Sequence, residues 1–201
     1  MLELCRRGLG CLFVVVLTSG TIAGDERVKP VPVRIETEKG DIELELYPDK
    51  APVTVANFLR YVDRKLYDNG RFHRTVTLKN QPDSKVKIEV IQAGLNPAKA
   101  KDELPPIKLE RTRDTKLVHK DGTVSMARDG PDTATADFFI CLGDQPELDF
   151  GGKRNADGQG FAAFGKVVRG MDVVKKIQAA PADGQMLKPA IKIVRIRRLP
   201  E

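Results

Sequence analysis

The sequence is poor in the residues that most enzymes use for metal binding or nucleophilic catalysis. Among 201 residues it has no tryptophan, three cysteines and two histidines, His73 and His119, and aromatic residues make up 5%. A Cys/His zinc site is therefore almost excluded, and a nucleophile with a general base would have to use one of the two imidazoles. The chain also carries no G-x-S-x-G motif and no phosphate-binding loop. We expect no cofactor and no metal.

Charge does not by itself indicate a nucleic-acid partner. Lysine and arginine number 34 against 28 acidic residues, which gives a formal net charge of +6. The two signs are interspersed along the chain, without a basic run. Because aromatic residues are scarce, the stacking platforms of single-stranded nucleic-acid binders are hard to assemble. We therefore expect no nucleic-acid binding, although the basic balance permits acidic partners.

The sequence also lacks an apolar run long enough to cross a bilayer. The apolar stretch 9–17 is well short of the roughly 20 residues that a membrane-spanning helix needs, and Arg6 and Arg7 precede it. Thr21 and Ala23 offer small side chains at the −3 and −1 positions of a cleavage site. This pattern is typical of a secretory signal cleaved after Ala23, and the alternative is a retained N-terminal anchor.

The expected organisation is then a signal peptide over residues 1–23, a linker over 24–30 and one domain over 31–201. Cleavage would remove two of the three cysteines and leave Cys141 alone, so that no intrachain disulfide could form. The chain length suits a single domain with a hydrophobic core of its own. We expect a periplasmic or secreted monomer that does not bind membranes once the signal has been removed.

Alternation of apolar and polar residues predicts many short strands. Eight segments show this pattern, namely 33–37, 41–46, 72–76, 86–92, 123–127, 138–142, 163–168 and 191–197. Gly40 supplies the positive φ of a hairpin between the first two. Helical spacing predicts a helix within 53–68, capped by Thr54, and a second over 171–179. The fold class is α+β, mainly β. Strands so short and numerous would close most economically into a barrel covered by the two helices.

Three blocks of the chain resemble the cyclophilins. They cover residues 37–74, 123–149 and 161–177, and they contain the strings FHR, SMAR, DFFI and FGKVV in this order. Each string is short, but their order and spacing are jointly specific. The resemblance implies an eight-stranded antiparallel β-barrel capped by two α-helices, which agrees with the strand and helix pattern. It also implies peptidyl-prolyl cis-trans isomerase activity.

Arg74 of the FHR string is the candidate catalytic residue. Rotation about an X-Pro bond breaks amide conjugation against a barrier of roughly 18–20 kcal/mol and requires no covalent intermediate. A cationic donor aimed at the prolyl nitrogen favours its twisted form, because the nitrogen lone pair is free only when conjugation is broken. Arginine suits this role because it stays charged and presents a fixed fork of donors. Position alone would instead favour a surface arginine paired with an acid.

The resemblance also implies which residues bind the substrate. Phe139, Leu148 and Phe161 match the positions that form the apolar pocket for proline, although each also has an interpretation as a core residue. Gln92 matches the glutamine that supports the catalytic arginine and the substrate. The resemblance thus predicts an apolar pocket beside the polar pair of Arg74 and Gln92.

Further matched positions lie along the rim of this pocket. Ala127 and Arg128 match a strand end whose backbone holds the peptide, a role that leaves the Arg128 side chain unconstrained. Asp137 occupies a substrate-binding position where the family has glutamine. Its carboxylate could pair with Arg74 and divert it from the substrate, or could point to solvent. In the first case Asp137→Gln should raise turnover.

Other departures from the family pattern also concern the pocket. Glu89 and Val90 stand where relatives have two large apolar residues, so that one wall is missing or rebuilt. Glu147 replaces an aromatic residue, and the segment 77–87 adds residues before Gln92. Two functions follow. The favoured one is a non-covalent isomerase acting on Pro-containing polypeptides among exported proteins. The alternative is a catalytically weak or inactive cyclophilin-like binding module or chaperone for proline segments.

Overall fold

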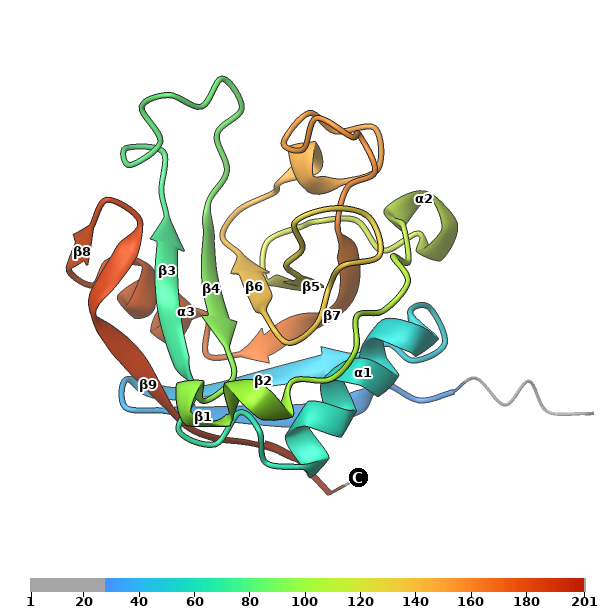
Figure 1. Ribbon diagram of the computed structural model, residues 1–201, viewed down its shortest axis with the longest axis vertical. Coiled ribbons are helices and arrows are strands. Elements are labelled where there is room, and N and C mark those ends of the chain that lie inside the picture. Colours follow the sequence, from blue (N-terminus) through green and yellow to red (C-terminus); the bar gives the residue numbers. More distant parts are fainter. Residues whose placement is uncertain (1–27, 201) are drawn as a thin grey trace, which may run out of the picture.

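The chain folds into a closed antiparallel β-barrel. The computed structural model describes residues 28–200, so the signal peptide expected over 1–23 and most of the linker over 24–30 lie outside the described residues (Figure 1). The strands are β1 (Val31–Thr37), β2 (Gly40–Leu46), β3 (Arg71–Val76), β4 (Val90–Gly94), β5 (Thr123–Met126), β6 (Phe138–Cys141), β7 (Ala162–Arg169), β8 (Ala182–Asp183) and β9 (Met186–Arg198).

Eight of these strands form the barrel. Their order is β1-β2-β7-β5-β6-β4-β3-β9, and pairing of β1 with β9 closes the ring. The two-residue β8 pairs only with the start of β9. All the pairings are antiparallel. The barrel expected from the strand pattern, and the eight antiparallel strands that the resemblance implies, are therefore confirmed.

The β1–β2 hairpin shows why alternation in the sequence produces this fold. Thr37 lies opposite Gly40, whose φ is +127°, a conformation that L side chains rarely adopt. Ile35 and Ile42 face each other inside the barrel and are fully buried. In the next cross-strand pair, on the outer face, Arg34 donates to Glu43 at 2.7 Å. The inward side chains build the core, and the outward charges keep the strand faces soluble.

Both expected helices are present. Helix α1 (Pro52–Asp63) packs against β7 and β9, and α3 (Met171–Gln178) packs against β2, β3 and β4. A four-residue helix, α2 (Thr112–Thr115), and short 3-10 helices at Pro97–Asp102 and Pro146–Leu148 were not expected. Within residues 28–200, no helix combines the length and the apolar character that crossing a membrane requires.

The cap of α1 differs from the expectation. Thr54 lies inside the helix and is fully buried, and its hydroxyl makes no capping bond. The free N–H groups of Val53 and Thr54 instead donate to the two carboxylate oxygens of Glu110, at 3.1 and 2.8 Å. Thr54 as a cap was therefore wrong. A carboxylate brought in by a distant segment satisfies the helix start and also complements its dipole.

Strand β4 begins later than expected. The segment 77–89 forms a loop around the buried side chain of Gln81, which donates to the carbonyl oxygens of Thr77 and Ile88 at 2.7 and 2.8 Å. Gln81 Oε1 also accepts from the Ile88 N–H at 3.3 Å. Because this amide takes over the backbone groups that a β-ladder would use, pairing starts only at Val90. The loop projects from the barrel at the top of Figure 1.

The buried apolar residues form two clusters. The larger one fills the barrel and includes Phe58, Tyr67 and Phe138, whose rings pack with centroids 5.3 to 5.5 Å apart. The smaller cluster consists of Val76, Ile88, Val90, Phe139, Cys141 and Leu148, with Ala127 and Phe161 packed against it. Phe138 and Phe139 are neighbours on β6 but belong to different clusters, as strand alternation requires. The smaller cluster therefore lies on the outer face of the barrel wall.

Candidate active site

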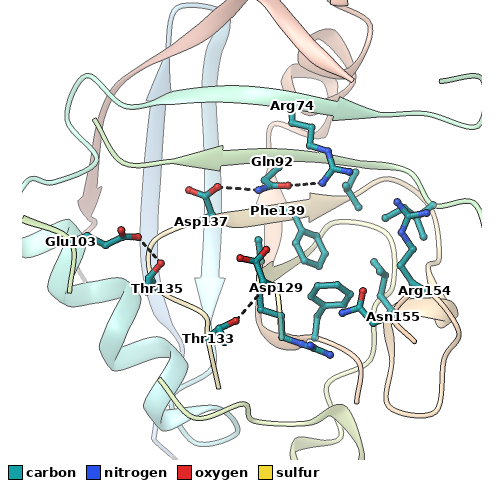
Figure 2. Close-up of a pocket in the computed structure, with 16 residues that line it drawn as sticks. Arg74, Gln92, Glu103, Asp129, Thr133, Thr135, Asp137, Phe139, Arg154 and Asn155 are labelled. Carbon is teal, nitrogen blue, oxygen red and sulfur yellow. Dashed lines mark hydrogen bonds between the residues drawn. The ribbon is translucent and has the colours of Figure 1, made fainter. Parts of the chain in front are cut away.

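One row of residues crosses neighbouring strands on this outer face. Arg74 of β3 lies opposite Gln92 of β4, and Gln92 lies opposite Phe139 of β6. The ladder shifts register between Phe72 and Arg74, so that Phe72 is buried in the barrel core while Arg74 faces outward. Antiparallel pairing thus places a cation, an amide and an aromatic ring side by side (Figure 2).

A cavity of about 460 Å³ opens over this row. The residues proposed from the sequence as catalytic or substrate-binding all line it: Arg74, Gln92, Ala127, Arg128, Asp137, Phe139, Leu148 and Phe161. Arg74, Gln92 and Phe139 lie on β3, β4 and β6, and the other five lie in segments between strands. The structure therefore brings all these side chains to a single cavity, which is the geometric condition for a shared site.

The floor of the cavity is apolar. The rings of Phe139 and Phe161 meet edge to face, with centroids 5.4 Å apart and planes at 90°. Leu148 is 1% exposed and Phe139 is 4% exposed, so both are fixed by packing. This floor can accept a compact apolar ring such as the pyrrolidine of proline.

Of the two alternatives for the wall at Glu89 and Val90, missing or rebuilt, the structure shows a rebuilt wall. Val90 and Ile88 both line the cavity and belong to the smaller apolar cluster. Glu89 does not line it, and its carboxylate accepts from Gln178 Nε2 at 3.4 Å. Glu147 also lies outside the cavity lining and accepts from the backbone N–H of Lys153 at 2.8 Å. Neither carboxylate therefore intrudes on the apolar floor.

Two neutral amides hold the guanidinium of Arg74. Gln92 Oε1 accepts from Nη1 at 3.0 Å, and Gln185 Oε1 accepts from Nε at 2.9 Å and from Nη2 at 2.6 Å. No carboxylate of the described residues pairs with Arg74, contrary to the surface ion-pair interpretation. Burial, together with the nearby charge of Arg154, lowers the pKa of Arg74 from its ordinary value, yet an arginine remains charged at physiological pH.

Asp137 contacts Gln92 instead of Arg74. Its Oδ2 accepts from Gln92 Nε2 at 3.0 Å and lies 3.4 Å from His73 Nε2. The predicted pairing of Asp137 with Arg74 is therefore wrong, and the carboxylate, whose side chain is 41% exposed, contacts Gln92 and His73 while it remains accessible to solvent. Burial raises the pKa of Asp137, and burial lowers the pKa of His73. A carboxylate can only accept, so it orients the Gln92 amide with its NH₂ towards Asp137 and its oxygen towards Arg74.

The Arg128 side chain is not free, contrary to expectation. It is 1% exposed and donates to both carboxylate oxygens of Asp157, at 2.7 and 2.9 Å. Its guanidinium also lies over the ring of Phe161, 5.1 Å from the centroid. Hydrogen bonds from Arg128 lower the pKa of Asp157 to about 2. Arg128 therefore fixes both the loop of Asp157 and the ring that closes the apolar floor. The neighbouring N–H of Ala127 donates to Asp137 O at 2.8 Å.

His119 does not serve the cavity as a base for a nucleophile. His119 lies between Asp149 and Ser125, with Nδ1 2.7 Å from Asp149 Oδ1 and Nε2 2.9 Å from Ser125 Oγ. This set has the order of a nucleophilic triad, but His119 is 1% and Ser125 0% exposed. The imidazole instead stacks on the ring of Phe139, with centroids 6.0 Å apart, and so helps to fix that ring in place. Cys141 is also buried, and burial raises the pKa of its thiol.

Acidic and basic side chains both line the cavity. In Figure 2, Glu103 and Asp137 lie on one side of Asp129 and Arg154 lies on the other. Sequence reasoning missed Ile88, Glu103, Asp129, Thr133, Thr135, Arg154, Asn155 and Gln185, which line the cavity or hold Arg74. They lie in loops or turns, where no periodic pattern marks which way a side chain points. Among residues 28–200, no cluster of three or more His, Cys, Asp or Glu side chains could hold a metal ion.

Comparisons with known proteins agree with this geometry. The family described as cyclophilin type peptidyl-prolyl cis-trans isomerase/CLD matches residues 32–198. A peptidyl-prolyl cis-trans isomerase of Acinetobacter baylyi is 34% identical over 169 residues, covering 84% of this chain and 82% of that protein. The peptidyl-prolyl cis-trans isomerase B of Escherichia coli is 38% identical over 148 residues, covering 73% and 83%. A crystal structure of a cyclophilin type isomerase from Cryptosporidium parvum superposes with a TM-score of 0.67 at 23% identity, covering 86% of this chain and 99% of that chain.

Proposed function

Because the chain belongs to the cyclophilin-type peptidyl-prolyl cis-trans isomerases, we propose that it accelerates rotation about X-Pro bonds without a covalent intermediate and that Arg74 is its catalytic residue. The observation that carries this proposal is the cavity itself, in which a guanidinium held by two glutamines lies beside an apolar floor. A relative from Cryptosporidium parvum was crystallised in the presence of the dipeptide Ala-Pro.

The proposed mechanism uses the donors that Arg74 keeps free. An arginine has five N–H donors, and the bonds to Gln92 and Gln185 use three of them. One hydrogen on each Nη atom is therefore free of a partner among the described residues. With the prolyl ring on Phe139 and Phe161, such a donor interacts with the prolyl nitrogen once twisting has released its lone pair. This bond is stronger in the twisted state than in either planar isomer, and so it lowers the barrier.

A coupled assay with a Pro-containing peptide tests this proposal against the alternative of a binding module. An isomerase increases the exchange rate in proportion to its concentration, whereas a module that only binds proline segments shifts populations without turnover. The positions of Glu89 and Glu147 outside the cavity lining weaken two of the reasons for the alternative. Salt-dependent retention on nucleic acid tests a further possibility, nucleic-acid binding, for which the basic charge is the only argument.

We propose further that the protein works outside the cytoplasm on Pro-containing segments of exported polypeptides, as a monomer. Arg6, Arg7 and the apolar stretch 9–17 support export, and the completeness of the cavity within one chain supports action as a monomer. N-terminal sequencing of protein purified from its own cells should find Gly24 as the first residue, in a soluble fraction. Recovery of Met1 in a membrane fraction would instead favour a retained anchor.

The contact between Asp137 and Gln92 leads to a prediction about pH. Because burial raises the pKa of Asp137, its carboxylate takes up a proton at a higher pH than an exposed aspartate would. The protonated group can donate to Gln92 Oε1 and compete with Arg74 for it. We therefore expect kcat/KM to fall on the acid side. Asp137→Asn should show a plateau about five-fold lower, equivalent to one hydrogen bond of about 1 kcal/mol, without this acid limb.

Three titratable groups near Asp137 must be separated from it in that measurement. They are His73, Glu103 and Asp129, whose charges all act on Asp137. His73→Gln is the control, because it should leave the acid limb in place. Asp137→Gln, which would raise turnover if the carboxylate diverted Arg74, should instead lower it. An unchanged acid limb in Asp137→Asn would contradict the orienting role of this carboxylate.

A further inference from the structure

The guanidinium of Arg74 has more contact with Gln185 than with Gln92. Gln185 Oε1 accepts from both Nε and Nη2, at 2.9 and 2.6 Å, whereas Gln92 accepts from Nη1 alone, at 3.0 Å. Gln185 lies in the two-residue turn between β8 and β9, directly after Gly184, whose φ is +58°. This short hairpin therefore delivers an acceptor to one edge of the guanidinium, opposite the edge held by Gln92.

The orientation of the Gln185 amide is also determined. Gln185 Nε2 donates to the backbone carbonyl of Asn80 at 3.1 Å. Since a carbonyl can only accept, the NH₂ group must face Asn80 and the oxygen must face Arg74. Asp137 orients Gln92 by the same logic on the other edge. The amides of Gln92 and Gln185, which accept from Arg74, are thus each oriented by a second hydrogen bond.

The loop that carries Asn80 is in turn tied to the hairpin and to β3. Asn80 Nδ2 donates to the carbonyl oxygens of Thr75 and Gly184, at 2.9 and 3.0 Å, and Asn80 Oδ1 accepts from the Thr77 N–H at 2.8 Å. The Thr75 N–H donates to Gln185 O at 2.8 Å. These bonds join the start of the 77–89 loop, the strand of Arg74 and the β8–β9 turn into one hydrogen-bonded unit.

We propose that Gln185 is a positioning residue, which acts through Arg74 and, with the Asn80 loop behind it, keeps the two free guanidinium hydrogens directed into the cavity. The inference rests on the proposed catalytic role of Arg74. A planar guanidinium held at one edge only can rotate about that contact and turn its donors to water or to the carboxylates of the cavity. A guanidinium held at both edges can donate to the twisted prolyl nitrogen without first reorienting. Donors that are already oriented in this way lower a barrier most.

Gln185→Met tests this inference, because methionine keeps the length and most of the volume of glutamine but offers no strong acceptor. Exchange NMR on a saturating X-Pro peptide should show kcat reduced by about ten- to a hundred-fold, with KM within about two-fold, as expected for lost orientation. Gln185→Asn, one methylene shorter, cannot reach Arg74 and should lose kcat similarly. Gln178→Met is the matched control, because the Gln178 amide bonds only Glu89, outside the cavity lining.

A double-mutant cycle with Arg74→Ala separates positioning from a general structural effect. If Gln185 acts through Arg74, adding Gln185→Met to Arg74→Ala should lower the residual rate no further. The Arg74 Nε–H signal should also exchange with water faster in Gln185→Met than in the unaltered protein, because its acceptor is gone. Equal fold losses in both backgrounds, or an unchanged kcat in Gln185→Met, would overturn the inference. Full turnover by Arg74→Ala would instead overturn the proposed function.

Discussion

Arg74→Ala should lower kcat/KM for X-Pro isomerisation by about ten- to a thousand-fold, the range found when one donor that stabilises a transition state is removed. The substitution removes a charged group that two glutamines hold beside the apolar floor, with two of its N–H donors unused. A protease-coupled assay or exchange NMR would measure the loss. Turnover equal to that of the unaltered protein would eliminate Arg74 as the catalytic residue.

The same variant should fold normally. Without Arg74, the oxygens of Gln92 and Gln185 face the open cavity, where water can satisfy them. We expect the free energy of unfolding to change by about 1 kcal/mol or less, as for half-exposed polar residues.

Two further variants separate the charge of Arg74 from its geometry. Arg74→Lys keeps the charge but cannot bond both glutamines at once, so its rate should fall between those of the alanine variant and the unaltered protein. Arg195→Ala is a control for loss of an arginine. It removes an exposed partner of Glu36, far from the cavity lining, and should leave turnover unchanged.

Phe139→Ala should have the second largest effect, because this ring belongs both to the smaller apolar cluster and to the floor of the cavity. It is 4% exposed, meets Phe161 edge to face and lies on the imidazole of His119. Truncation of a buried phenylalanine costs about 3–5 kcal/mol of unfolding free energy. Loss of the ring surface that contacts proline should reduce kcat/KM by about ten-fold or more, which corresponds to ~1.4 kcal/mol.

Urea unfolding and the isomerisation assay measure these two effects on one protein sample. Phe150→Ala is the matched control, because Phe150 is only half-buried, does not line the cavity and contacts the exposed Arg113. It should change kcat/KM little. Phe139→Leu keeps part of the apolar surface and should lose less of both quantities. A stable Phe139→Ala variant with normal kcat/KM would mean that the substrate proline does not rest on this ring.

The sequence by itself determined the barrel and most of its elements. Burial of one strand face leaves a period-two pattern that can be read locally, and the segments 33–37 and 41–46 on either side of Gly40 predicted the first hairpin correctly. The apolar positions of α1 and α3 were equally visible from their helical spacing. Hydrophobic burial is non-directional, so periodicity is enough to identify it.

The start of strand β4 is a place where prediction from alternation was wrong. Residues 86–89 alternate like a strand, but the amide of Gln81 occupies the backbone groups of Ile88 and keeps the segment out of the sheet. The same loop supplies Ile88 to the cavity, which is why a wall that looked absent at Glu89 is present. The hydrogen bonds between Gln81 and Ile88 form only in the folded loop, and they override the local alternation that predicted a strand.

The polar partners of the site were decided by the tertiary structure alone. Asp137 is 45 residues from Gln92, and Gln185 is 111 residues from Arg74. Whether they meet depends on which residues face each other once β1 and β9 have closed the ring. A hydrogen bond is directional and forms only within a few tenths of an ångström of its preferred length, so no local pattern can encode it. The resemblance located Arg74, and only the closed barrel determined which amides hold its guanidinium.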